Sequence, residues 1–163
     1  MIWKKSSTEK MADNRIIETS LEELMPLMLE CLSAGKSFRF SPKGTSMLPM
    51  LREGRDSVLL SPVTKKLSKF DIPLYRRENG SFVLHRIVET GETFTCIGDN
   101  QFVFEKEIYP EQIIAVVSGF YRGEKFYSVK NFGYRVYCRF WNSTRNLRRF
   151  WRRGIGFLRR HFK

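Results

Sequence analysis

Short apolar runs separated by turn residues fill the middle of this chain, and they constrain its fold more than any other feature. Runs with the length and alternation of strands lie at residues 38–40, 58–60, 73–76, 82–88, 93–97, 113–121 and 126–129. Asn79-Gly80 separates two of these runs and is typical of a hairpin turn. The pattern predicts a mainly β domain with many short strands in a curled sheet or barrel.

One helix is predicted ahead of the strands, over residues 20–34. Thr19 or Ser20 fits the N-cap, acidic residues fill the first turn, and apolar residues follow at helical spacing. Pro26 is unfavourable inside a helix but is tolerated in its first turns, and Gly35 provides a stop.

The net charge of +12 is concentrated at the C-terminal end. Residues 125–163 contain 12 basic residues and no acidic one, whereas residues 1–124 contain 17 of each sign. This asymmetry separates a neutral domain from a cationic appendage. We therefore divide the chain into a flexible N-terminus (1–19), a domain (20–130, with its β core at 36–130) and a basic amphipathic C-terminal segment (131–163).

The cysteines and histidines argue against a disulfide framework or a zinc site. Cys31, Cys96 and Cys138 are an odd number without CxxC spacing and lie in apolar settings, which favours buried or half-buried free thiols. With two histidines and no Cys/His cluster, we expect no metal and no cofactor. No segment has the apolar length of a signal peptide core or a membrane span, so we expect a cytoplasmic protein.

Ser46 and His85 form a candidate catalytic pair. A serine hydroxyl is a weak nucleophile near neutral pH, and imidazole is the side chain that most often removes its proton. Ser46 lies in the run GTSMLP at 44–49, and His85 lies in the strand-like run FVLHRIV at 82–88.

Four sequence motifs, two of which contain Ser46 and His85, follow one another along the chain in the order seen in a known family. They are GTSMLP at 44–49, KFDIPLYRR at 69–77, LHRIV at 84–88 and GDNQ at 98–101. Over residues 36–121 the chain resembles the signal-peptidase and SOS-repressor peptidase superfamily. The resemblance implies a β-rich catalytic core with Ser46 as nucleophile. It places His85 where the endoplasmic-reticulum-type branch has its base, and it implies that Asp99 is needed for activity.

The chemistry of these residue types agrees with the resemblance. Asp99 would orient the imidazole or stabilise its cation, and Thr45 or nearby backbone N–H groups would bind the oxyanion. Met47 and Pro49 complete the serine motif and are assigned to substrate binding. The structural alternatives are an ordinary turn serine, a half-buried strand histidine, and an aspartate in the tight turn 98–100.

Two departures from the family pattern bear on the expected activity. Phe70 replaces a family glycine that would allow a positive φ angle, so we expect that turn to differ in shape. Signal peptidases of this class are tethered by a transmembrane segment, and none is found here. A general secretory signal peptidase is therefore not the expected function.

The C-terminal segment has the pattern of a cationic amphipathic helix from Phe140 onward. Aromatic and aliphatic residues recur every three to four positions with arginines around them. We assign these residues to an anionic membrane surface: Phe140, Trp141, Arg148, Arg149, Trp151, Arg152, Arg153, Arg159 and Arg160. The alternatives are a nucleic-acid arm and docking of the aromatic face on the domain itself.

Together these features predict a serine endopeptidase with a Ser46–His85 dyad that cuts a peptide or leader segment at the inner face of the membrane. The main alternative is a non-catalytic peptide-binding or regulatory module on the same fold. Self-cleavage is a further alternative, because Ala34-Gly35 resembles the dipeptide that SOS repressors cut.

Overall fold

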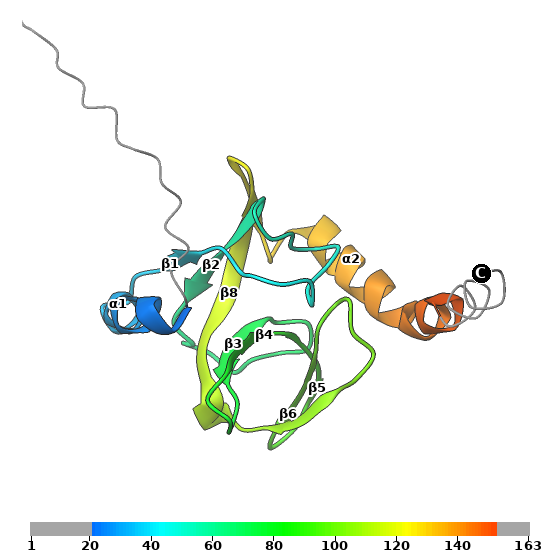
Figure 1. Ribbon diagram of the computed structural model, residues 1–163, viewed down its shortest axis with the longest axis horizontal. Coiled ribbons are helices and arrows are strands. Elements are labelled where there is room, and N and C mark those ends of the chain that lie inside the picture. Colours follow the sequence, from blue (N-terminus) through cyan, green and yellow to red (C-terminus); the bar gives the residue numbers. More distant parts are fainter. Residues whose placement is uncertain (1–20, 153–163) are drawn as a thin grey trace, which may run out of the picture.

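The computed structural model of the protein describes residues 21–152 (Figure 1). Helix α1 (Leu21–Ser33) comes first, strands β1 to β9 follow, and helix α2 (Phe132–Ser143) comes after the last strand. The strands are β1 (Phe38–Phe40), β2 (Asp56–Ser61), β3 (Pro73–Arg76), β4 (Phe82–Leu84), β5 (Arg86–Thr90), β6 (Phe94–Ile97), β7 (Glu105–Ile108), β8 (Ile113–Arg122) and β9 (Lys125–Ser128). The prediction of a mainly β fold with a helix at each end is confirmed.

The strands form two antiparallel sheets. The larger has the order β1-β2-β8-β3-β4, with β9 also paired to β8, and the smaller has the order β5-β6-β7. The long, curved strand β8 connects the upper and lower parts of the larger sheet in Figure 1, because it pairs with β2 at one end and β3 at the other. The predicted hairpin at Asn79-Gly80 is confirmed as the β3–β4 turn.

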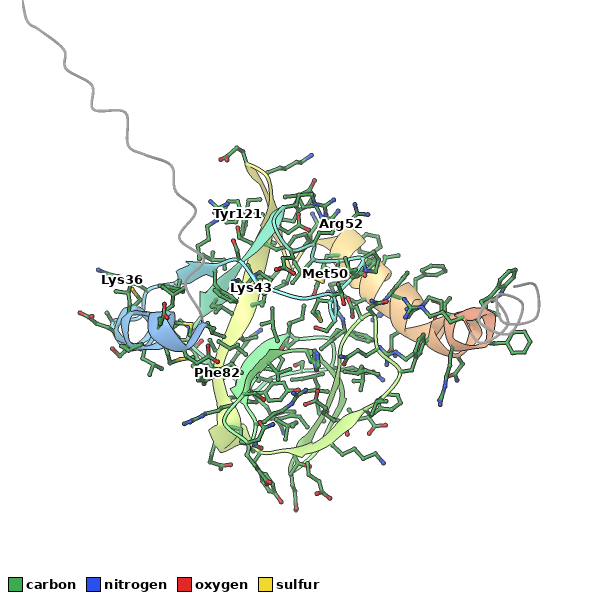
Figure 2. The ribbon with its side chains drawn as sticks, in the orientation of Figure 1. Lys36, Lys43, Met50, Arg52, Phe82 and Tyr121 are labelled. Carbon is green, nitrogen blue, oxygen red and sulfur yellow. The ribbon has the colours of Figure 1, made fainter. Side chains whose placement is uncertain are left out.

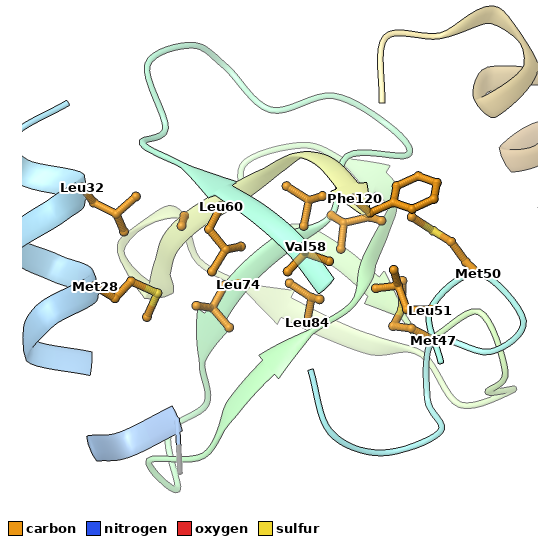
Figure 3. Close-up of a cluster of buried hydrophobic side chains, with 13 residues drawn as sticks. Met28, Leu32, Met47, Met50, Leu51, Val58, Leu60, Leu74, Leu84 and Phe120 are labelled. Atoms are coloured by element: carbon orange, nitrogen blue, oxygen red, sulfur yellow. The ribbon is translucent and has the colours of Figure 1, made fainter. Parts of the chain in front are cut away.

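Two hydrophobic clusters lie on opposite faces of the β3–β4 hairpin. Leu74 and Leu84 enter the first cluster, while Tyr75 and Val83 enter the second. Successive side chains of a strand point to opposite faces, so a hairpin buried on both faces separates two cores. In Figure 3 the first cluster extends from Met28 of α1 to the loop between β1 and β2.

The C-terminal helix begins earlier than the sequence pattern suggested. Asn131 caps α2, and its side chain accepts a hydrogen bond from the Gly133 N–H at 2.8 Å. Helical residues resume at 145–152 after a break at Thr144, the C-cap. Within residues 21–152, no helix combines the length and the apolar character required to cross a bilayer. The predicted flexible N-terminus (1–19) lies outside the described residues.

Candidate active site

Ser46 lies on the loop between β1 and β2, residues 41–55, which we call the serine loop. Lys43 and Met50 mark this loop in Figure 2. Met47, Met50 and Leu51 are buried in the first cluster, whereas Ser46 is half-buried. Apolar side chains thus anchor the loop while the serine stays accessible. Met47, predicted to take part in substrate binding, lines the same cleft as Ser46 and His85 and is also packed in the first cluster.

The turn at 98–100 holds the serine loop from the other side. The Asn100 N–H donates to the Ser46 carbonyl at 2.8 Å, and the Asn100 side chain donates to the Thr45 carbonyl at 3.1 Å. A Cβ atom at Gly98 would lie 2.6 Å from the Ser46 carbonyl oxygen, so a side chain there would displace the loop. The GDN motif therefore positions Ser46 through the backbone.

His85 occupies the single position between β4 and β5, where the chain passes from the larger sheet to the smaller one. Its side chain is almost completely buried. The Nδ1 atom lies 2.9 Å from Glu105 Oε1. A neutral imidazole that donates its Nδ1 proton to this carboxylate keeps Nε2 unprotonated, which is the form required of a general base.

Glu105 is itself fixed by two donors. The Tyr75 hydroxyl donates to Oε2 at 2.8 Å, and the Arg77 guanidinium binds both carboxylate oxygens. Burial opposes the charge of Glu105, but the bonds from Arg77 and Tyr75, with His85 nearby, outweigh it and lower the pKa of this carboxyl. Glu105 is therefore ionised at neutral pH and able to orient the imidazole.

The same surroundings keep His85 neutral. Burial lowers the pKa of the imidazole below its ordinary value of 6.5, and the attraction of Glu105 offsets only part of this effect. An imidazole with a lowered pKa is uncharged at neutral pH, with only one of its two ring nitrogens protonated. It is then ready to accept a proton.

Ser46 and His85 line one cleft of about 250 Å³, together with Arg77 and Gln101. No hydrogen bond joins the Ser46 hydroxyl to His85 within residues 21–152. In the same part of the chain the Ser46 N–H donates to no acceptor. The Thr45 side chain is exposed and does not line this cleft.

Asp99 makes no hydrogen bond to His85 and so does not orient the imidazole, although its negative charge raises the pKa of His85. Its fully buried carboxylate accepts hydrogen bonds from Arg86 Nε at 2.8 Å and Nη2 at 2.7 Å. Burial lowers the pKa of Arg86, but Asp99 outweighs burial and raises it well above its ordinary value. Asp99 therefore neutralises the cation beside the base, and Glu105 takes the orienting position.

Arg86 joins four parts of the molecule at this ion pair. Besides Asp99, it donates to the Phe70 carbonyl at 3.2 Å, to the Tyr134 hydroxyl at 2.8 Å and to the Met50 sulfur at 3.0 Å. Phe70 has a φ of 79°, so the turn adopts the left-handed conformation that its side chain disfavours. Phe70 thus has the positive φ angle that the family glycine would allow, and the Arg86 hydrogen bond to its carbonyl helps to hold the turn.

The C-terminal helices dock on the GDN turn through residues that the sequence analysis assigned to a membrane. Trp141 donates to the Asp99 carbonyl at 2.8 Å, and Arg148 donates to the same oxygen at 3.2 Å. Arg148 also stacks over the Trp141 ring at 3.6 Å, and Arg152 bonds to Asn100. Trp141 and Arg148 therefore face the domain. Phe140, Arg149 and Trp151 are exposed, and Arg153, Arg159 and Arg160 lie outside the described residues.

Pro49 lies away from the Ser46–His85 cleft. With Leu48 it borders a groove of about 640 Å³ whose other wall is formed by the C-terminal helices. Its assignment to substrate binding at the catalytic cleft is therefore not supported by its position.

Glu105 is the residue that sequence reasoning missed. The run EKEI at 105–108 has no strong strand pattern, and nothing local distinguishes Glu105 from Glu107. Only the pairing of β7 with β6, which sets Glu105 opposite Cys96, brings its carboxylate to His85.

The cysteines within residues 21–152 are free thiols. Cys96 and Cys138 are buried and Cys31 is half-buried, as expected from their apolar settings. Among residues 21–152, no group of three or more His, Cys, Asp or Glu side chains is placed to hold a metal ion.

Comparison with protein-family models, with curated proteins and with solved structures finds no match to this chain.

Proposed function

We propose that this protein is a serine endopeptidase in which Ser46 is the nucleophile, His85 the general base and Glu105 the residue that orients the base. The observation that carries the proposal is the 2.9 Å contact between Glu105 and Nδ1 of His85, a residue that lines the same cleft as Ser46. The order of the four sequence motifs supports the same assignment.

The reaction follows from the state of each group. Nε2 of neutral His85 removes the proton of Ser46 Oγ as the oxygen attacks a peptide carbonyl, and the Ser46 N–H stabilises the oxyanion. The imidazolium then protonates the leaving amine, and water hydrolyses the acyl-enzyme with the same base. In the substrate complex the Ser46 hydroxyl must come within hydrogen-bond distance of His85. Catalytic hydrogen bonds often tighten in this way only when substrate binds.

An extended peptide is the substrate shape that suits this cleft. Strand β4 is at the end of the larger sheet, and its residues Phe82, Val83 and Leu84 line the cleft directly before His85. A peptide strand added along this edge would present its carbonyl groups beside the catalytic pair.

A serine-directed phosphonate tests the nucleophile directly. We expect wild-type protein to form a covalent adduct at Ser46, and Ser46→Ala and His85→Ala to form none under the same conditions. Intact mass and peptide mapping report the adduct. Ser57→Ala, which removes a buried serine hydroxyl outside the cleft, is the matched control and should react like wild type. Equal labelling of the Ser46→Ala protein would rule out the proposed nucleophile.

The pH dependence of labelling tests the base. The reaction needs neutral imidazole, so its rate should rise as pH passes upward through the pKa of His85. Because burial lowers that pKa, the midpoint should lie below the ordinary value of 6.5. The rate constant measured across acidic and neutral pH checks this. A midpoint above 6.5 would contradict a buried, neutral base.

A non-catalytic peptide-binding module is the second candidate, favoured by the missing hydrogen bond between Ser46 and His85. It predicts peptide binding in the cleft without any adduct. Wild-type protein that binds peptide but never reacts with the phosphonate would decide for this alternative.

A further inference from the structure

The C-terminal helices leave a continuous set of large apolar side chains uncovered on their outer side. Phe132, Val136 and Phe140 follow one another every four residues on α2, so they lie on one helix face. Leu147, Phe150 and Trp151 continue the set after the break at Thr144. Between 49 and 79% of each of these six side chains is exposed. We call them the apolar ridge.

Other residues of the same helices make the contacts that dock them on the domain. Tyr134 and Cys138 contact Arg86, and Trp141 bonds to the Asp99 carbonyl. Figure 1 shows α2 projecting beside the sheets rather than between them. An uncovered apolar surface of this kind marks an interaction site.

A basic hollow adjoins the ridge on α2. Five cationic side chains from three separate segments line this space of about 700 Å³. They are Lys65, Lys69, Lys130, Arg135 and Arg139. Asp71 is the only carboxylate in the lining, and it accepts the Ser68 N–H at 2.8 Å. Such an accumulation of like charge suits an anionic partner.

The apolar ridge and the basic hollow together favour a lipid partner over a nucleic acid. Val136 and Leu147 offer no aromatic face on which a base can stack, and they are as exposed as their aromatic neighbours. A ridge of aliphatic and aromatic side chains beside cations matches a bilayer interface, where apolar groups enter the acyl boundary and cations meet phosphates.

We propose that the apolar ridge and the basic hollow bind the surface of an anionic phospholipid bilayer. The groove that joins Phe140, Leu147 and Trp151 to Leu48 and Pro49 extends this surface to the serine loop. A bilayer bound at the ridge would therefore border the serine loop at Leu48 and Pro49, on a different side of the loop from the Ser46–His85 cleft.

Flotation of the full chain with phospholipid vesicles tests the proposal. We expect binding to phosphatidylcholine vesicles that contain phosphatidylglycerol and much weaker binding to phosphatidylcholine alone. Phe140→Ser should weaken the partition about tenfold, because it removes a large apolar side chain that would leave water on binding. Arg139→Gln should weaken it about fivefold, the effect of one cation near an anionic surface.

Matched controls lie at the other end of the molecule. Leu27→Ser on α1 removes a side chain of similar exposure, and Lys36→Gln removes one exposed charge. Both should float like wild type. Ser46→Ala should also float like wild type, so membrane binding and peptidase activity can fail independently. Equal binding to both vesicle types, or wild-type flotation of Phe140→Ser and Arg139→Gln, would overturn the proposal. So would tight binding to single-stranded RNA without vesicle binding.

Discussion

Glu105→Gln should lower the rate constant of phosphonate labelling at Ser46 by about 10²- to 10⁴-fold. The amide keeps the shape of the carboxylate and its bond to Tyr75, but it no longer requires a donor on His85 Nδ1. The imidazole can then adopt the wrong tautomer, with its proton on Nε2, and its cation loses the nearby negative charge. Stopped-flow or quenched labelling with intact-mass detection measures the change.

The pH profile separates this positioning effect from simple damage to the fold. The Glu105 carboxylate raises the pKa of His85 against the effect of burial, so its removal should shift the acidic midpoint of labelling to still lower pH. Glu107→Gln makes the same chemical change on an exposed side chain of β7 and should alter neither rate nor midpoint. A Glu105→Gln protein with wild-type labelling would remove Glu105 from the proposed site.

Asp99→Ala should lower the free energy of unfolding by about 3–5 kcal/mol, the usual effect of leaving one partner of a buried ion pair alone. Arg86 is fully buried, and Asp99 accepts two of its hydrogen bonds. Without the carboxylate, a guanidinium that cannot lose its proton stays buried beside Met50 and Phe70. Equilibrium denaturation monitored by tryptophan fluorescence measures the change.

A double variant tests whether the loss comes from the unpaired cation. Removing both charges with Arg86→Met and Asp99→Leu should be less destabilising than Asp99→Ala, because an apolar pair leaves no buried charge. Glu89→Ala removes an exposed carboxylate from β5 and should change stability by less than about 0.5 kcal/mol. An Asp99→Ala protein as stable as wild type would contradict a structural role for this pair.

These two predictions assign the acidic residues differently from the sequence motifs alone. The GDN motif suggested that Asp99 orients the imidazole or stabilises its cation. In the structure the hydrogen bonds of Asp99 hold Arg86, and Glu105 contacts the imidazole. Asp99 holds Arg86, Gly98 and Asn100 hold the serine loop, and Trp141 and Arg148 hold the turn itself. The C-terminal segment is thus physically connected to Ser46 through one turn of the backbone.

The sequence by itself determined the features that depend on local pattern. Alternating side chains and turn residues indicated the strands and the Asn79-Gly80 hairpin, because strand periodicity and turn conformation depend on neighbouring residues. The helix at 20–34 followed from the same kind of signal, and the charge asymmetry marked the C-terminal segment. The motifs also selected Ser46 and His85, which line one cleft.

Only the tertiary structure decided which residues support this pair. Glu105 reaches His85 because β7 pairs with β6 in the smaller sheet, and Asp99 turns to Arg86 because a buried guanidinium requires a carboxylate. The tertiary contacts also divided the arginine-aromatic segment into an inner face that docks on the GDN turn and an outer apolar ridge. Long-range strand pairing and charge compensation depend on residues far apart in the chain, so no local pattern specifies them.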